Sequence, residues 1–372
     1  AIRAYNCDYS EIRNNTLDQF TYRGIDINES SYCVIEENIL TTNAFASHLY
    51  GIFLYYWGSE YSSIINNHIE ITNTQSGGDM YGIFEVKNGL IEGNTLILNN
   101  TNTNSDGYGM YIYESIARNN IISVDFDNSS YAGITIGSWS SYGGNIIEYN
   151  IINADYNSSG IYLASHPTGN TDIITNNTIV SHDPNSSYGV YVNTSRTNFM
   201  SNNIFYNLTT GIYNNSASNS ISYNDFYNNG TDIGGTVPDY FGDEYGTYEN
   251  DVAYDYYNNI FADPLFTDFE NENYSLQGGS PCIDAGDPDI VDENGSVSDI
   301  GALGPYCDGV FDCMWVCNGS AFVDDCGVCS GDTSDHEANS DQDCNGDCFG
   351  EAAYDGCGVC SGGATGHVAD SD

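Results

Sequence analysis

Gly51-Ile-Phe-Leu-Tyr55 and Asn67-His-Ile-Glu-Ile71 are two short, largely apolar segments of one repeating unit. Side-chain character that alternates over four or five residues is typical of a strand and not of a helix. Loops rich in Asn, Ser, Gly and Asp separate such segments, for example residues 99–107. The pattern therefore predicts short strands joined by many turns.

The unit recurs along the chain. Asn-x-(Ile/Leu/Phe) occurs at successive intervals of 23, 29, 27, 26, 30, 27, 26 and 21 residues, at Asn15, Asn38, Asn67, Asn94, Asn120, Asn150, Asn177, Asn203 and Asn224. A second pattern, Gly followed by Ile, Met or Val, keeps step with it at Gly24, Gly51, Gly82, Gly109, Gly133, Gly160, Gly189 and Gly211. Units this short cannot bury an apolar face alone and must stack. We predict an all-β, single-stranded parallel solenoid whose nine asparagines form an internal amide ladder.

Two of these units, Tyr81-Gly-Ile-Phe84 and Ile174-Thr-Asn-Asn-Thr-Ile179, resemble the repeats of the pectin-lyase-like superfamily, and the resemblance covers roughly residues 10–235. It implies a right-handed parallel β-helix. Residues 259–302 resemble the closing segment of many secreted bacterial β-helix proteins. We therefore assign residues 1–235 to a β-helix of about nine turns, 236–306 to its closing segment and 307–372 to cysteine-rich repeats.

Charge limits the possible partners. Lys and Arg number 6 against 52 Asp and Glu, a formal net charge of −46. Such a surface repels nucleic acid and anionic membranes, and it attracts divalent cations. A hydrophobic share of 40 % still allows a buried core, so disorder is not expected. No apolar run is long enough for a membrane span.

The C-terminal region contains a duplicated cysteine pattern with an offset of 31 residues. The copies, in units near 312–342 and 343–372, are Cys313-x3-Cys317-x8-Cys326-x2-Cys329 and Cys344-x3-Cys348-x8-Cys357-x2-Cys360. They resemble the Asp-Cys-Gly-Val-Cys repeats of long secreted or surface proteins, which implies a spacer. Four cysteines could hold zinc or form two disulfides, and a secreted setting favours disulfides. We expect pairing within each unit, with three connectivities open, together with Cys7–Cys33 and Cys282–Cys307.

Calcium is the expected metal, and no organic cofactor is expected. Asp341-x-Asp343-x-Asn345-Gly346 matches the opening of an oxygen-lined calcium loop, although Glu351 is one place from the position of the closing ligand. A second candidate is formed by Asp287, Asp289 and Asp292. The alternative interpretation of both is a plain acidic turn.

Fourteen Asn-x-Ser/Thr sequons are candidate glycosylation sites, although a chain rich in these residues also forms sequons by chance. They are Asn14, Asn28, Asn99, Asn128, Asn157, Asn176, Asn185, Asn193, Asn207, Asn214, Asn229, Asn273, Asn294 and Asn318.

We expect no catalytic residue. The resembling superfamily contains polysaccharide lyases and hydrolases, whose chemistry needs clustered cations or paired carboxylates. Here the six basic residues fall on different units without a cluster. A tyrosine precedes the repeat glycine at Tyr50, Tyr81, Tyr108 and Tyr188. These rings could bind sugars, but a structural ladder is the favoured interpretation.

The expected function is that of an extracellular or surface-attached structural protein, which forms filaments by head-to-tail self-association. An uncapped solenoid end exposes unpaired backbone groups, so we expect residues 1–10 to contact another subunit, with calcium relieving charge repulsion. Glycans are possible additional partners. The alternatives are a secreted polysaccharide-binding or polysaccharide-cleaving enzyme, and a β-helical adhesin on a cysteine-repeat stalk.

Overall fold

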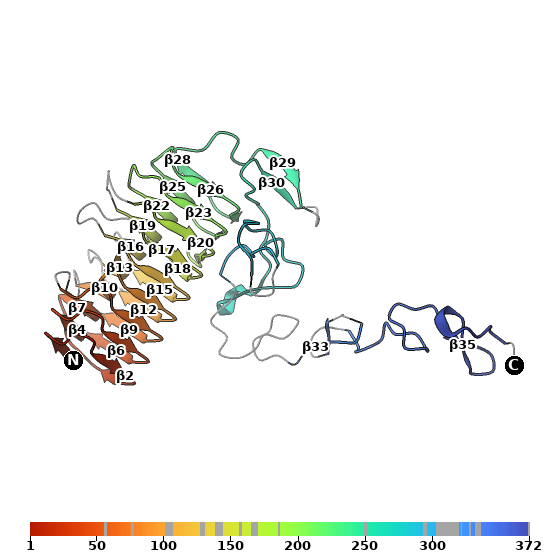
Figure 1. Cartoon of the computed structure of the whole chain (residues 1–372). Helices are drawn as coiled ribbons and strands as arrows, with labels where there is room; N and C mark the ends of the chain where they lie inside the picture. The colour runs from red at the N-terminus through yellow and green to blue at the C-terminus, as the bar shows by residue number, and fades with distance from the viewer. Residues whose placement is uncertain are drawn as a thin grey trace. The chain divides into compact units, whose positions relative to one another are not determined.

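Three parallel sheets wind along most of the chain (Figure 1). The computed structural model describes all residues except 56–57, 76–77, 101–106, 127–130, 138–143, 156–157, 165–169, 185–186, 249–251, 293–295, 303–319, 321, 327–328, 332–335 and 371–372. It divides into two compact units, Ala1–Pro305 and Tyr306–Asp372.

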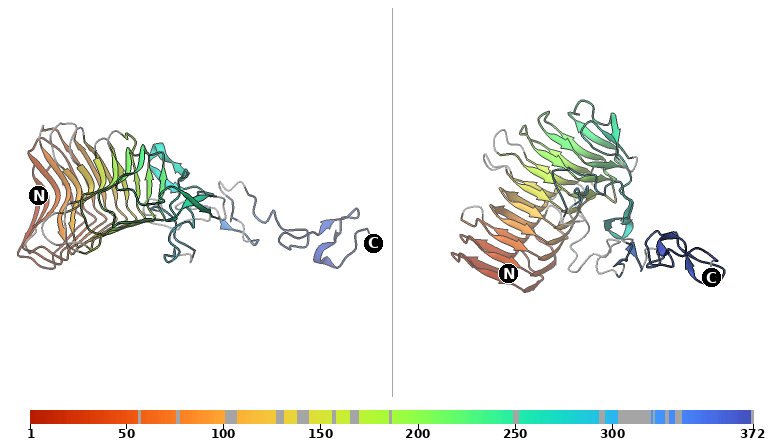
Figure 2. Two further views of the ribbon diagram at one scale, coloured as in Figure 1. Left: turned by 90° about the horizontal axis from the view of Figure 1, so that it is seen from above. Right: turned by 45° about the vertical axis from the view of Figure 1, so that its right-hand side comes forward.

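Each coil of the first unit contributes one strand to each sheet, and successive coils stack in chain order (Figure 2). Sheet 1 contains β1 (Ile2–Tyr5), β4 (Arg23–Asn28), β7 (His48–Leu54), β10 (Asp79–Lys87), β13 (Gly107–Tyr113), β16 (Tyr131–Ile136), β19 (Ser158–Leu163), β22 (Tyr188–Val192), β25 (Thr210–Asn214) and β28 (Thr231–Gly235). Sheet 2 contains β2 (Glu11–Arg13), β5 (Val34–Glu36), β8 (Ser63–Ile65), β11 (Leu90–Glu92), β14 (Ile116–Arg118), β17 (Ile146–Glu148), β20 (Ile173–Thr175), β23 (Phe199–Ser201) and β26 (Ser220–Ser222). Sheet 3 contains β3 (Thr16–Asp18), β6 (Ile39–Ala44), β9 (His68–Asn73), β12 (Thr95–Asn100), β15 (Ile121–Phe126), β18 (Ile151–Ala154), β21 (Thr178–Val180), β24 (Ile204–Tyr206) and β27 (Asp225–Tyr227).

Register places like residues above like residues, and this fills the core. In sheet 1, Ile25 pairs with Ile52, Ile52 with Ile83 and Ile83 with Met110, and all four side chains are fully buried. The repeat glycines allow sheet 1 to approach sheet 3 closely. A Cβ atom on Gly82 would lie 2.5 Å from Leu96 Cδ2 and 2.6 Å from the carbonyl oxygen of Gly109. The predicted all-β parallel solenoid is confirmed.

A single left-handed residue makes the corner between sheets 2 and 3. The residue before every ladder asparagine has a positive φ, as at Asn66 (φ 53°) and Asn119 (φ 55°). Asn tolerates this conformation better than other residues with a Cβ atom. The corner therefore explains why several units read Asn-Asn, and it leaves Glu37 (φ 54°) and Tyr149 (φ 54°) in a strained backbone conformation.

We expect Glu37→Asn to raise the free energy of unfolding by about 0.5–1 kcal/mol, because Asn adopts the left-handed region at lower cost. Glu37 is exposed, so its side chain has little packing to lose. Chemical denaturation with circular dichroism measures the change. Glu37→Ala is the matched control and should not stabilise the fold, and equal gains from both variants would assign the effect to charge.

The nine predicted asparagines lie in one hydrogen-bonded column. Asn94 is typical: its Nδ2 donates to Asn120 Oδ1 at 3.0 Å, and its backbone N donates to the same oxygen at 2.9 Å. The same two bonds join each ladder member to the next, from Asn15 to Asn224. The column thus satisfies buried amides that would otherwise be costly.

The ladder has a further member that the repeat search missed. Asn224 Nδ2 donates to Asn259 Oδ1 at 3.1 Å, and the Nδ2 of Asn259 lies 3.2 Å from both carboxylate oxygens of Asp255. Asn259 opens an Asn-Ile-Phe sequence that fits the same pattern, but its interval of 35 residues hid it. Asp255 therefore ends the column with an acceptor.

The closing segment folds back against the outer face of sheet 3. It contains β29 (Glu244–Thr247), β30 (Ala253–Asp255), β31 (Phe266–Asp268), the 3-10 helix η1 (Phe269–Asn271) and β32 (Asn273–Leu276). Ile151, Val180 and Ile204 of sheet 3 form a second apolar cluster with residues of this segment, including Phe266 and Ile300. The backbone N of Gly301 also donates to the carbonyl oxygen of Asn202 at 2.7 Å. The segment thus covers an apolar strip on the last coils.

The second unit has very short strands and little apolar core. Its elements are β33 (Phe322–Val323), β34 (Cys329–Ser330), β35 (Ala353–Tyr354), β36 (Cys360–Ser361) and the 3-10 helix η2 (Gly363–Thr365). Each β-pair is antiparallel, β33 with β34 and β35 with β36. Disulfides and carboxylate hydrogen bonds hold this unit together. Along the described chain, no helix is long and apolar enough to cross a membrane.

Candidate functional site

The outer face of sheet 1 carries stacked aromatic rings. Tyr50, Tyr81 and Tyr108 lie in register on β7, β10 and β13, with ring centroids 4.7 Å and 5.7 Å apart. A second column on the same strands consists of Phe53, Phe84 and Tyr111. The rings largely bury one another, which fits the expected structural ladder.

Tyr188 does not continue the first tyrosine column directly. The register runs from Tyr108 through Ala132 and Ser159 before it reaches Tyr188, so small side chains interrupt the column. Tyr188 instead packs against Tyr191, with ring centroids 5.2 Å apart. Among the described side chains, the aromatic surface therefore has one part on β7–β13 and another on β19, β22 and β25, where Tyr162 also stacks on Tyr191.

All six basic side chains form ion pairs with carboxylates. Arg3 and Arg23 contact Asp26, and Arg13 contacts Glu11 and Glu36. The remaining pairs are Lys87–Glu60, Arg118–Glu92 and Arg196–Asp172. A lyase-type base would have to leave such a pair before it could act on a uronate.

A second polar column lies at the corner before sheet 2, and it contains a buried ion pair. The column members precede the sheet 2 strands and are Cys33, Ser62, Gly89, Ser115, Asn145, Asp172, Asn198 and Asn219. Asp172 Oδ1 accepts from the backbone N and Nδ2 of Asn145 at 3.0 Å and 2.9 Å, and Arg196 Nη2 donates to Asp172 Oδ2 at 2.6 Å. Both charged side chains are almost fully buried: that of Asp172 is 0 % exposed and that of Arg196 is 3 % exposed. Sequence reading missed this column because its members share small size and polarity, not one residue type.

Cys282 is a free thiol buried against Asp225. Its Sγ lies 3.4 Å from Asp225 Oδ2, and both side chains are fully buried between β27 and the closing segment. The expected Cys282–Cys307 disulfide is therefore wrong, because this thiol points to the carboxyl group; Cys307 lies outside the described residues. Burial, with added repulsion from Asp263 and Asp232, raises the pKa of Asp225 to about 8.

Stability should consequently fall as the pH rises through the range in which Asp225 loses its proton. The folded state holds this proton up to about pH 8, whereas the unfolded chain releases it near pH 4, so its contribution is complete at low pH and lost toward pH 8. We expect Asp225→Asn to reduce the decline between pH 5 and pH 7 by about 1 kcal/mol per pH unit. Denaturant titrations at several pH values measure it. Exposed Asp18→Asn is the control, and an unchanged slope in Asp225→Asn would contradict the prediction.

The two cysteine repeats share one carboxylate-centred hydrogen-bond frame. In the first repeat, Asp324 accepts from the backbone N of Cys326 at 2.9 Å, the Oγ of Ser330 at 2.8 Å and the backbone N of Asn339 at 2.9 Å. In the second repeat, Asp355 accepts from the residues 31 positions later, Cys357, Ser361 and Asp370, at 3.0 Å, 2.7 Å and 3.1 Å. These bonds hold the pKa of the Asp355 carboxyl far below its usual value, with that from Ser361 contributing most. The frame sets the loop that presents the third cysteine of each repeat.

The described disulfides differ from the expected pairing within units. Cys344–Cys360 does lie within the second repeat, but Cys326–Cys348 joins the first repeat to the second. The Cα atoms of Cys326 and Cys348 are 5.2 Å apart. Cys313, Cys317 and the neighbourhood of Cys307 lie outside the described residues, and the side chain of Cys329 is not described.

The expected Cys7–Cys33 disulfide is also absent, since both cysteines are free. Cys33 is buried in the second polar column, where its backbone N donates to Ser62 Oγ at 3.2 Å, and Cys7 is exposed. Burial raises the pKa of the Cys33 thiol. The Cys33 side chain is buried and the Cys7 side chain is exposed, which explains why these two cysteines, one coil apart, do not form a disulfide.

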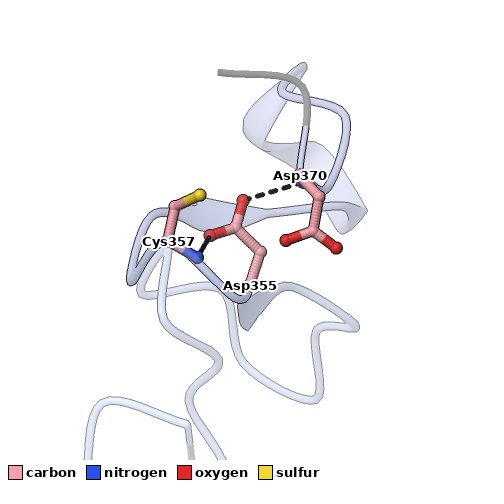
Figure 3. Close-up of side chains that lie close together, drawn as sticks. All are labelled: Asp355, Cys357 and Asp370. Atoms are coloured by element: carbon pink, nitrogen blue, oxygen red, sulfur yellow. Dashed lines mark hydrogen bonds between the residues drawn. The ribbon is translucent and has the colours of Figure 1, made fainter.

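Among the described residues, Asp355, Cys357 and Asp370 form a group whose possible ligand atoms all lie within 4.8 Å of one another (Figure 3). Figure 3 shows the Asp355 carboxylate bonded to the backbone of both other residues. Asp370 Oδ1 in turn accepts from the backbone N of Gly356 at 2.9 Å. The carboxylates therefore already serve the loop, and the Cys357 thiol is free and exposed.

The carboxylates of the first calcium candidate make contacts with neighbouring residues of the chain. Asp343 Oδ1 accepts from the backbone N of Asn345 and Asp347 at 2.9 Å and 3.0 Å, and its Oδ2 accepts from Ala352 N at 2.9 Å. These bonds, with that from Ala352 the strongest, lower the pKa of Asp343. Asp341 pairs with His336 at 3.0 Å. The loop is thus organised by its own N–H groups, and calcium binding at these residues stays a prediction.

The three residues of the second calcium candidate have different neighbours. Asp287 and Asp289 are linked to each other, because the backbone N of Asp289 donates to Asp287 Oδ1 at 3.0 Å. Asp292 instead lies near Asp284 and Asp299, and burial raises the pKa of both Asp292 and Asp299, the latter to about 7. These residues do not fit a single preformed calcium site.

Two of the sequons cannot carry glycans in the folded chain. Asn176 and Asn214 are 1 % exposed, and their Nδ2 groups donate to Ser298 and Thr236. Asn14 and Asn193 are exposed. Asn28, Asn99, Asn207, Asn229 and Asn273 are half-buried. Asn128, Asn157, Asn185, Asn294 and Asn318 lie outside the described residues.

Three parallel sheets and a continuous internal amide ladder define the class of protein, a parallel β-helix followed by disulfide-linked repeats. Residues 1–152 match the family described as a right handed beta helix region. The match supplies the predicted handedness and agrees with the sheets over the coils that it covers. No curated protein matches the chain.

Proposed function

We propose that the chain is an extracellular structural protein, in which a rigid β-helix is continued by covalently linked cysteine repeats. The observation that carries this proposal is Cys326–Cys348, which joins one repeat to the next. Disulfides of this kind persist in oxidising compartments and are rare in the cytosol. A link between repeats also limits extension of the segment, which suits a spacer under load.

Features of the β-helix support the same proposal. Its internal columns satisfy buried polar groups coil after coil, and its basic side chains are taken up in ion pairs. The net charge of −46 favours hydration and diffuse binding of divalent cations over binding of an acidic polymer. We include calcium as a counter-ion of this surface, without a defined cage.

Head-to-tail assembly is part of the proposal. A strand whose outer edge is unpaired can accept a strand of another chain, which is the contact that such an assembly would use. Residues 1–10 would then contact another subunit, and a contact that does not close on itself propagates as a fibre.

Negative-stain electron microscopy and sedimentation of the full chain test the assembly. Fibres are expected in calcium, and shorter particles after chelation. Tyr5→Pro removes a backbone donor from β1 at an exposed position and should shorten the fibres. Val237→Pro, at an exposed position of the closing segment whose φ is not positive, should not. A chain that stays monomeric at high concentration in calcium would exclude assembly, and thiol counting on secreted material would separately test the oxidising location.

Polysaccharide binding is a second candidate, favoured by the aromatic columns on sheet 1. Ring faces and tyrosine hydroxyls can contact sugars, and Arg23 Cζ lies 3.5 Å from the ring centroid of Phe53 at one end of the columns. Affinity electrophoresis against neutral and acidic polysaccharides would detect it. Retardation that is lost in Tyr81→Ala but kept in Tyr245→Ala, an exposed control, would favour this function.

A further inference from the structure

The first cysteine repeat presents a face that binds the second repeat. Cys326 forms the disulfide with Cys348, and the Cys348 sulfur lies 3.5 Å from the carbonyl oxygen of Asp325. His336 Nε2 lies 3.0 Å from Asp341 Oδ2 at the end of the first repeat, next to the segment that leads to Cys348. The disulfide therefore holds the loop of the second repeat that contains Cys348 against the first repeat.

The second repeat builds the corresponding face 31 residues later. Cys357 takes the place of Cys326, and its backbone N is held by Asp355 at 3.0 Å, as that of Cys326 is held by Asp324 at 2.9 Å. His367 takes the place of His336 and contacts Ser361 Oγ at 3.2 Å, where His336 contacts Ser330 Oγ at 2.9 Å. The same backbone thus presents a cysteine in both repeats, and Cys357 is exposed and free.

We propose that the face around Cys357 is a docking site for a further cysteine repeat of the same type. The bond would join Cys357 to the cysteine that corresponds to Cys348 in that repeat. The known occupant of the equivalent face supports this choice, because Cys326 is bonded to a loop of this kind. The inference goes beyond the proposed function and does not depend on fibre formation.

A metal site is the competing interpretation of Asp355, Cys357 and Asp370. The first repeat has Asn339 in place of Asp370 and a disulfide in place of the thiol, so the shared feature of the two faces is not a ligand set. Both oxygens of Asp355 also accept hydrogen bonds from the loop itself. The hydrogen bonds of Asp355 are explained by its role in holding the loop that presents Cys357.

The bond forms by thiol–disulfide exchange. The Cys357 thiolate attacks a mixed disulfide on the incoming cysteine, the new sulfur–sulfur bond forms, and the small thiol leaves as its thiolate. The Cys357 proton passes to solvent. A low-molecular-weight disulfide such as oxidised glutathione supplies the oxidising equivalents when it forms the mixed disulfide.

The test uses the full chain with Cys7→Ser, which removes the other exposed thiol among the described residues. The probe is a synthetic peptide of residues 338–368 with Cys357→Ser, a Cys344–Cys360 disulfide and glutathione on Cys348. A second peptide carries the same residues with 341–343 and 345–347 permuted. Mass spectrometry follows the adduct and the released glutathione. We expect the native peptide to react about tenfold faster than the permuted one, because docking raises the effective concentration.

Three variants complete the design. Adding Cys357→Ser should abolish the adduct. Adding both Cys348→Ser and Cys357→Ser instead frees the thiol of Cys326, whose reaction rate with the native peptide serves as the reference. We expect the rate at Cys357 to approach that reference rate. Asp370→Asn, which makes the second repeat resemble the first, should keep the peptide preference. Equal rates for the two peptides, or preferential formation of a Cys357–Cys357 dimer, would overturn the proposal. Protection of Cys357 from alkylation by equimolar zinc, lost in Asp370→Asn, would establish the metal site instead.

Discussion

Replacing Arg196 by methionine is expected to lower the free energy of unfolding by about 3–5 kcal/mol, the usual cost of leaving one buried charge without its partner. Asp172 is fully buried, and its Oδ2 accepts from Arg196 Nη2. Arg196 Nη1 also donates to the carbonyl oxygen of Asn170 at 2.9 Å, which loses its donor in the variant. Denaturant unfolding followed by circular dichroism measures the loss.

The double variant Arg196→Met with Asp172→Asn is the decisive comparison. Asn145 and Asn198 occupy the neighbouring positions in the column, so an asparagine at 172 suits the site and carries no charge. We expect most of the stability to return, to within about 1 kcal/mol of the native chain, because both charges are removed together. If the double variant were as unstable as Arg196→Met alone, packing by the arginine stem and not charge would be the cause.

Asn120→Ala, in the middle of the ladder, should destabilise the chain by about 3 kcal/mol because it leaves buried donors without an acceptor. Asn94 loses the oxygen that accepts from both its backbone N and its Nδ2. The bonds from Asn120 Nδ2 to Ile91 O and Arg118 O are lost as well. Thermal and chemical unfolding of the full chain measure the difference.

Asn15→Ala is the matched control at the first coil. Asn15 is half-buried, and its Nδ2 donates to Asn38 Oδ1 and to the carbonyl oxygen of Arg13. Solvent can replace those partners, so we expect a loss of about 1 kcal/mol or less. Equal losses at the two positions would mean that burial along the column does not determine the cost.

Much of the β-helix could be predicted because each coil repeats one requirement. An amide at the corner before sheet 3 needs the same amide above and below, so Asn38, Asn67 and Asn94 are recognisable without a structure. The close approach of sheet 1 to sheet 3 similarly restricts the repeat position to glycine, as at Gly82. Because each column needs the same residue type in every coil, the fold is recognisable as a repeat in the sequence.

The candidate sites were harder to predict because they depend on contacts between distant segments. Asp225 and Cys282 are 57 residues apart and meet only when the closing segment folds back. Cys326–Cys348 crosses the boundary that the duplicated pattern suggested, since pairing follows docking of one loop on the next and not the limits of the repeat. Burial at Asn176 likewise depends on the distant Ser298.

The amide ladder also has an electrical direction. Every side-chain amide donates from Nδ2 toward the next coil, so the amide dipoles align and sum, with the positive end at Asn259 and the negative end at Asn15. Asp255 places a carboxylate against the positive end, as an acidic residue does at the N-terminus of a helix. A solenoid held by asparagine columns is therefore a polar rod, and the sense of its polarity is set by which atom of each amide faces the following coil.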